Sequence, residues 1–289
     1  MSEKGGRRLS SASKRAAAPP PLTARHKTLA VDVRDSIAYV GLARPEVHNA
    51  FDETSIAEMT EALHAIDGDE AIRAVVLFGQ GKSFCAGADL NWMKRMATFS
   101  QAENLADAGA LAAMLNTLYL LTKPTIARVH GAAFGGGVGL IACCDVAYAA
   151  VDATFSFSEA KLGLVPATIA PYVIEAIGAG AARRYFLSAE RFAATEALRI
   201  GLIHDLSPLS ELDAKIDGLL NAMLLAGPCA QSEGKALIRA VAHRPIDDAV
   251  IADTANRIAS VRASPEGKEG VAAFLEKRAP AWTAAMRKK

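Results

Sequence analysis

The residues of this chain that could support chemistry gather in two short glycine-containing segments. They span residues 84–90 (FCAGADL) and 131–137 (GAAFGGG), and each follows an apolar, strand-like run and opens onto a helix-like one. Small residues let a ligand approach the main chain, and a helix N-terminus leaves its first N–H groups unpaired and partly positive. Two such loops predict an oxyanion hole, in which a pair of backbone donors stabilises the negative oxygen of an enolate.

Glu159 is the carboxylate best suited to move a proton beside such a hole. It follows a predicted strand in the sequence Phe155-Ser156-Phe157-Ser158-Glu159, and its neighbours are largely apolar. A dry pocket raises the pKa of a carboxyl toward the range useful for proton transfer. A surface or helix-capping glutamate is the alternative, and the residues alone leave both open. Asp89 has two interpretations as well: it belongs to the catalytic site that the first loop would form, or it caps a helix.

The histidines offer no comparable signal. His130 lies at a predicted strand end beside a glycine turn, where a histidine is more often hydrogen-bonded structure than a catalyst. No Ser-His-Asp arrangement with a nucleophile elbow and no metal-ligand spacing occurs. We therefore expect neither a metal nor a cofactor.

The elements that must position these residues alternate between strand and helix. Strands are predicted over residues 36–42, 73–78, 125–129 and 145–149, which predicts an α/β core with mostly parallel pairing. One helix should begin after Asp52, and a longer one should lie between the two glycine loops and end before Lys123-Pro124. Beyond residue 167 the pattern is almost wholly helical, with breaks at Gly178, Gly180, Gly227-Pro228 and Pro265.

As a set, the two loops and three further segments resemble the crotonase (enoyl-CoA hydratase/isomerase) superfamily. The further segments are residues 44–51 (RPEVHNAF), 157–166 (FSEAKLGLVP) and 196–203 (EALRIGLI), so the resemblance covers nearly the whole chain. It implies a spiral of ββα units followed by a helical C-terminal region that assembles homotrimers, often paired into hexamers. The division we expect is a disordered basic extension over residues 1–26, the spiral core over 27–220 and the helical region over 221–289.

The resemblance also implies roles for individual residues. The oxyanion donors fall on the backbone N–H groups of Ala88 and Gly136, and Glu159 matches a catalytic glutamate of the hydratases. The acyl-CoA thioester is then the substrate and not a cofactor. The implied contacts with CoA or the acyl chain are Ala50, Ala86, Asp89, Leu90, Gly135 and Gly139. Lys277 either reaches a CoA phosphate of a neighbouring subunit or is a solvated helix charge.

The chain departs from the best-known hydratases at Gly139, where they carry a second glutamate. The sequences of residues 87–96 and 161–173 most resemble bacterial methylglutaconyl-CoA and isohexenylglutaconyl-CoA hydratase-like members of the family. These members tend to have glycine at the position of Gly139. We expect Gly139 to leave room for a branched or carboxylated acyl chain, with Glu103 or Asp107 as possible second carboxylates. Hydration of a 2-enoyl-CoA is the predicted reaction. The alternatives are a Δ3,Δ2-enoyl-CoA isomerase with one glutamate and a non-catalytic CoA-binding homologue.

The bulk composition excludes other classes. The 289 residues carry a formal net charge of +1 and only 6% aromatic residues, which argues against nucleic-acid binding. No apolar run is long enough to span a membrane. The four cysteines are expected to be reduced thiols, with Cys143 and Cys144 in the core. We expect a cytoplasmic protein; organelle targeting by the basic, serine-rich extension is the minority interpretation.

Overall fold

A computed structural model describes residues 26–283 of the chain. Almost all of the predicted N-terminal extension and the last six residues therefore lie outside the described residues. The strands of the main sheet carry the loops that build the candidate site.

The main sheet has six strands in the order β1-β2-β3-β4-β6-β9. β1 (Leu29–Arg34) and β2 (Ile37–Leu42) form an antiparallel hairpin, and all the other pairings in this sheet are parallel. The remaining strands are β3 (Ala74–Gly79), β4 (Thr125–Val129), β6 (Val146–Ala150) and β9 (Asp205–Ser207). The predicted α/β class and the predominance of parallel pairing are confirmed.

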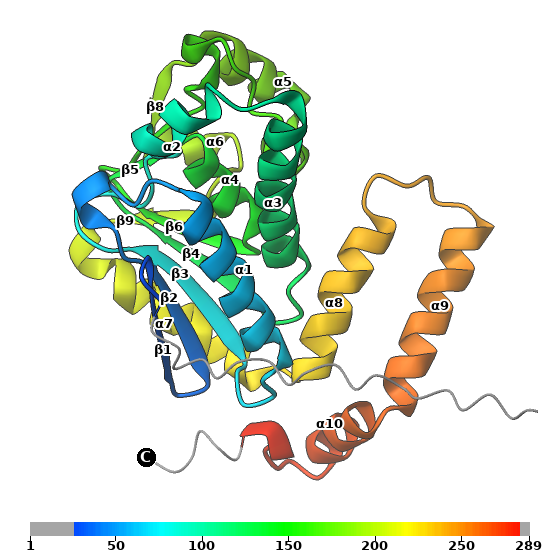
Figure 1. Cartoon of the computed structure of the whole chain (residues 1–289). Coiled ribbons are helices and arrows are strands. Elements are labelled where there is room, and N and C mark those ends of the chain that lie inside the picture. The colour runs from blue at the N-terminus through cyan, green and yellow to red at the C-terminus, as the bar shows by residue number, and fades with distance from the viewer. Residues whose placement is uncertain (1–25, 284–289) are drawn as a thin grey trace, which may run out of the picture.

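Both faces of this sheet are buried, as the continuous apolar sequence of β3 predicts. Val75 and Leu77 face a core shared with α1 (Glu53–Gly68) and α3 (Gln101–Leu120), whereas Ala74 and Val76 face a second core shared with α7 (Leu209–Leu225). Asp52 caps α1 by accepting a hydrogen bond from the Ser55 N–H, as predicted. Figure 1 shows α1 and α3 side by side on one side of the sheet and α7 on the other.

A smaller sheet and four helices complete the core. β5 (Ala132–Phe134) pairs in parallel with β7 (Thr154–Ser156), which pairs antiparallel with β8 (Arg191–Ala193). The helices are α2 (Leu90–Met96), α4 (Gly136–Cys143), α5 (Ala170–Ser188) and α6 (Ala194–Arg199). The predicted break at Gly178 is a kink inside α5, where that glycine has φ 72°. Two short 3₁₀ turns, η1 (Pro45–Val47) and η2 (Glu159–Leu162), precede α1 and α5.

The last three helices stand away from the sheet (Figure 1). They are α8 (Pro228–Val241), α9 (Asp248–Ala263) and α10 (Pro265–Leu275). The expected boundary after residue 220 falls inside α7, whose apolar side stays on the sheet as far as Leu224. The separate helical part therefore begins near Pro228. None of the helices within residues 26–283 is long and apolar enough to cross a membrane.

Candidate active site

The two glycine-containing loops run side by side and are joined by backbone hydrogen bonds. The Phe84 N–H donates to the His130 carbonyl at 2.9 Å, the Cys85 N–H to the Ala132 carbonyl at 3.1 Å, and the Phe134 N–H to the Cys85 carbonyl at 2.9 Å. The first loop follows β3 and the second follows β4. Because these two strands are parallel, both loops lie at the same end of the strands. Each then opens onto a helix, α2 or α4, as the sequence predicts.

The two predicted oxyanion donors are unpaired within the described residues. Phe51 pairs with both neighbours of Ala88, accepting from the Asp89 N–H at 2.7 Å and donating to the Gly87 carbonyl at 2.6 Å, so the Ala88 N–H is left over. Gly136 is the first residue of α4, where a helix has no partner for its N–H. Neither amide donates a hydrogen bond to another part of residues 26–283. Both groups are thus available to a ligand oxygen.

The Glu159 carboxylate lies against the second loop. Glu159 is the first residue of η2, and a Cβ built on Gly135 would lie 3.1 Å from its Oε1. Its Oε2 is buried and accepts no hydrogen bond from the described residues. Burial raises the pKa of this carboxyl, and a hydrogen bond from its own backbone N–H only partly opposes that rise. A carboxylate in such surroundings suits proton transfer.

Gly139 does not open the space that the sequence led us to expect. Gly139 lies in the first turn of α4, where its N–H donates to the carbonyl of the N-cap residue Gly135 at 3.3 Å. A Cβ built on Gly139 would lie 2.2 Å from Ile169 Cγ2 and 3.7 Å from Leu115 Cδ2. Ile169 therefore fills the volume beside Gly139. The expectation that Gly139 leaves room for a branched or carboxylated acyl chain is wrong.

The two suggested second carboxylates are engaged elsewhere. Glu103 forms a capping box with Ser100 at the start of α3. Asp107 accepts a hydrogen bond from the Trp92 indole at 3.1 Å. Of the three carboxylates Glu103, Asp107 and Glu159, Glu159 is the one that lies beside a glycine-containing loop, at Gly135.

Arg44 joins the turn before α1 to the first loop, a role that the sequence analysis missed. Its guanidinium donates to the Ala50 carbonyl at 2.8 Å and to Asp89 Oδ2 at 2.8 Å, and it lies 3.0 Å from Asp52. A second contact between the same segments is the hydrogen bond from the Ala86 N–H to the His48 carbonyl. The Arg-Pro sequence pointed to a turn, but the partners of the arginine lie far along the chain.

Asp89 serves as the cap of α2 rather than as an open ligand. It is 4% exposed, accepts hydrogen bonds from the Asn91 and Trp92 N–H groups and pairs with Arg44. Burial alone would raise the pKa of Asp89, but these backbone bonds and the guanidinium lower it overall. The capping alternative from the sequence is confirmed, and contact between the Asp89 side chain and CoA stays a prediction.

The other expected CoA contacts are placed differently from one another. Ala50 is buried and Ala86 partly buried beside the first loop, whereas Leu90 is 73% exposed at the start of α2. Lys277 is exposed just beyond α10, and Figure 1 shows α10 far from α2 and α4. Within one chain Lys277 does not join the site, and its contact with a neighbouring subunit's ligand stays a prediction.

Three of the four thiols are poorly suited to chemistry because they are buried. Cys85, Cys143 and Cys144 are buried, and all four cysteines are free. Burial raises the pKa of Cys85 and of Cys144 to about 12 and that of Cys143 well above its usual value. Cys143 and Cys144 are in the core, as predicted. No cluster of three potential metal ligands occurs within residues 26–283.

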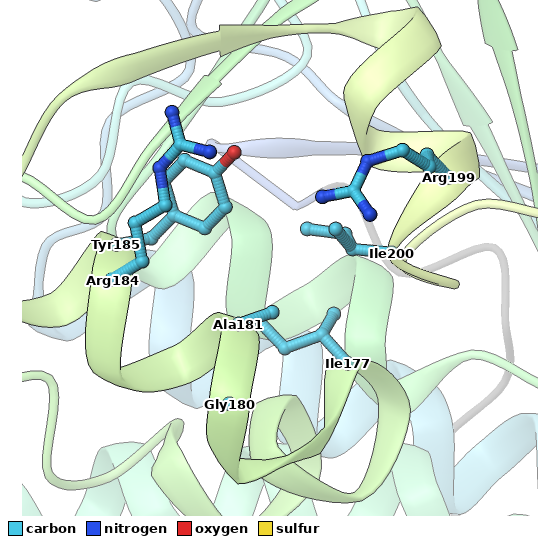
Figure 2. Close-up of a pocket in the computed structure, with 7 residues that line it drawn as sticks. All are labelled: Ile177, Gly180, Ala181, Arg184, Tyr185, Arg199 and Ile200. Atoms are coloured by element: carbon cyan, nitrogen blue, oxygen red, sulfur yellow. The ribbon is translucent and has the colours of Figure 1, made fainter.

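A separate pocket of about 410 Å³ lies between α5 and the end of α6 (Figure 2). Ile177, Ala181 and Ile200 line it, with Arg184 and Arg199 at its rim. These arginines pair with Glu190 and Glu196, and the pocket contains none of the predicted site residues. It adds no group to the oxyanion site.

The spiral core with its two paired loops defines a crotonase-fold protein, and comparisons with known proteins agree. Residues 32–285 match the enoyl-CoA hydratase/isomerase family. An enoyl-CoA hydratase structure from Shewanella pealeana is 44% identical, with a TM-score of 0.88 over 90% of this chain and 98% of its own.

Curated relatives point the same way. Short-chain-enoyl-CoA hydratase of Clostridium acetobutylicum is 33% identical over 84% of this chain and 92% of its own length. Crotonyl-CoA hydratase of Syntrophomonas wolfei is 30% identical over 88% of this chain and 96% of its own length. The chain therefore belongs to the enoyl-CoA hydratase/isomerase family.

Proposed function

We propose that this protein adds water to, or removes it from, the double bond of a 2-enoyl-CoA, with Glu159 as the acid/base. The observation that carries this is the buried Oε2 of Glu159 beside the loop that ends at Gly136, since neither Oε2 nor the Gly136 N–H has a hydrogen-bond partner among residues 26–283. The substrate we favour is a branched one such as 3-methylglutaconyl-CoA. The support for that choice is the similarity of residues 87–96 and 161–173 to the hydratase branch that acts on such compounds.

One carboxylate can complete the hydration. The thioester oxygen accepts hydrogen bonds from the Ala88 and Gly136 N–H groups. Glu159 takes a proton from water as the hydroxide bonds to C3. The π electrons of the C2=C3 double bond then form a C1=C2 bond, and the carbonyl π electrons move onto the thioester oxygen as an enolate. Glu159 then returns the proton to C2. The two donors bind the enolate more tightly than the ground-state carbonyl, which lowers the barrier.

Isomerisation is the second candidate, and the packing at Gly139 favours it specifically. A 1,3 proton shift needs one base that removes a proton from C2 and returns it to C4, without any water. Position 139 supplies no second carboxylate to help bind water, because the buried Ile169 occupies the space that a side chain there would need. Hydration and isomerisation thus share the same base, and both place negative charge on the thioester oxygen, in an enolate for hydration and in a dienolate for isomerisation.

An assay with three substrates separates these reactions. Purified protein is given 3-methylglutaconyl-CoA, crotonyl-CoA and a 3-enoyl-CoA, with Glu159→Gln as the inactive control. Hydration of 3-methylglutaconyl-CoA supports the proposal, and turnover of the 3-enoyl-CoA alone would replace it with the isomerase. CoA binding without any turnover would indicate a non-catalytic homologue.

We also propose a homotrimer or a hexamer as the working assembly, in a cytoplasmic location and with no dissociable cofactor. The assembly is supported by the large apolar side chains that are exposed on or beside the last three helices: Ile238, Ile246, Ile251, Ile258, Val271, Phe274 and Leu275. Exposed apolar surface of this extent is typical of subunit contacts.

A further inference from the structure

We propose that His130 is a positioning residue that fixes the register between the two loops carrying the oxyanion donors. The inference rests on the proposed function, because it assumes that the Ala88 and Gly136 amides bind the thioester oxygen. It concerns a different group, however, and a side chain that touches no substrate.

Both ring nitrogens of His130 are occupied. Nε2 lies 2.9 Å from the Gly81 carbonyl oxygen, and Nδ1 lies 3.3 Å from Nη1 of Arg128. A guanidinium can only donate and a carbonyl can only accept, so Nδ1 accepts while Nε2–H donates. This assignment follows from the partners, and it makes His130 a link between Arg128 and the turn at Gly81.

The main chain of the same residue holds the other end of that turn. The His130 carbonyl accepts from the Phe84 N–H at 2.9 Å, three residues after Gly81. The next residue, Gly131, has φ +61°, and a Cβ there would lie 2.0 Å from the Lys82 carbonyl oxygen. The turn and the start of the second loop are therefore in direct contact, and His130 binds both ends of the turn.

This contact lies at the root of the oxyanion hole. From Phe84 the first loop continues to Ala88, and from His130 the second continues to Gly136, with a parallel bridge between Cys85 and Ala133 on the way. A slip of one residue between the loops would displace one donor by about 3.3 Å relative to the other. Oxyanion donors must lie within about 2.7–3.1 Å of one oxygen, so such a slip would separate them.

The far end of the link is anchored on a different element. Arg128 makes two hydrogen bonds to Asp213 of α7, at 2.5 and 3.0 Å. The His130 side chain is 9% exposed, and together with Gly81 and Arg128 it lines a cavity of about 610 Å³. The link from α7 to the Gly81 turn thus runs through one buried imidazole.

The test compares two replacements of similar size. His130→Gln keeps one donor and one acceptor at the end of the side chain, whereas His130→Met fills the space without either. His204→Met is the matched control, because His204 also bonds the backbone, at the Ala147 N–H, but on the strand pair β6–β9. Steady-state kcat and KM with the best substrate, the dissociation constant for CoA and the melting temperature are measured for each variant.

The proposal predicts that His130→Met loses at least about tenfold in kcat, since loss of a whole oxyanion donor costs about 10²–10³-fold. Its KM and CoA affinity should stay within about threefold, and His130→Gln should recover most of kcat. Unchanged kcat in His130→Met would overturn the proposal. It would mean that Asn49, which donates hydrogen bonds to the Gln80 and Ser83 carbonyls, is sufficient to hold the turn in place. The proposal is also overturned if His130→Gln loses as much kcat as His130→Met does, whether or not the His130→Met variant folds. Inactive wild-type protein would instead refute the proposed function.

Discussion

At the scale of single residues, the site depends on a carboxylate kept in surroundings that do not suit its charge. Glu159 Oε2 has no partner within the described residues, and burial raises the pKa of the carboxyl. The pKa of the Glu159 carboxyl is lower in the unfolded chain than in the folded one. Just above pH 4.5 this carboxyl is therefore protonated more often in the folded state than in the unfolded state. Folding stability should therefore fall as pH rises through that window. The charge to which we assign the catalytic role should therefore weaken the fold at neutral pH.

Glu159→Gln should accordingly melt at a higher temperature than the wild type at pH 7, and the difference should shrink toward pH 4. Differential scanning calorimetry across this range measures it. Glu190→Gln is the control, because Glu190 is exposed and its ion pair with Arg184 lowers its pKa. A wild-type protein more stable than Glu159→Gln at pH 7 would contradict this account of the site.

The sequence predicted part of this site and missed part of it for physical reasons. Glu159, Ala88 and Gly136 belong to local motifs, and the structure brings their segments together. Ile169 follows Gly139 by thirty residues, and no local pattern shows that its side chain fills the volume beside that glycine. Arg44 was likewise visible only as a turn residue, because Asp89 is 45 positions away. Contacts between distant segments depend on packing, which periodicity does not encode.

At the scale of elements, we propose that the N-terminus of α4 supplies one oxyanion donor, the Gly136 N–H, and this role can be tested without changing a polar side chain. Proline has no N–H and is tolerated at the first position of a helix. Gly136→Pro should therefore lose about 10²–10³-fold in kcat. Gly136→Ala is the matched control, because it keeps the N–H while its Cβ would also meet the Phe51 ring, at 3.0 Å. Equal kcat in the two folded variants would exclude the Gly136 amide as a donor.

The packing of α4 against the start of α5 gives a second prediction at this scale. Gly139→Ala should cost about 1–3 kcal/mol in the free energy of unfolding, because its Cβ would overlap Ile169. Ile169→Ala removes that overlap, so the double variant should be more stable than the sum of the two single changes implies. Urea unfolding of all four proteins measures this coupling. Strict additivity would mean that the two residues do not share the space.

Long elements followed from the sequence more readily than short ones. The four strands and two helices predicted for the core are present, because their apolar periodicity extends over five residues or more. β5, β7, β8 and β9 have three residues each, which is too short for an alternating pattern to stand out. β8 and β9 also fall in the region that reads as helical.

At the scale of the whole molecule, α8 to α10 bury few of their own residues and leave Phe274 82% exposed. Light scattering after size-exclusion chromatography should give three or six times the 30.3 kDa chain mass. Phe274→Asp should reduce that mass by placing a charge in an apolar contact. Leu105→Asp changes another large exposed apolar side chain, on α3, and is the comparison. A monomeric wild type, or an unchanged mass in Phe274→Asp, would contradict the proposed assembly.

The central claim is that one thioester oxygen binds both the Ala88 and the Gly136 amide while Glu159 faces the carbons next to it. A crystal structure of Glu159→Gln with an unreacted enoyl-CoA tests it most directly. The account predicts a thioester oxygen about 3 Å from both nitrogens, with the amide of residue 159 beside C2 and C3. A thioester bound away from either nitrogen, or a residue 159 turned away from the acyl chain, would contradict it.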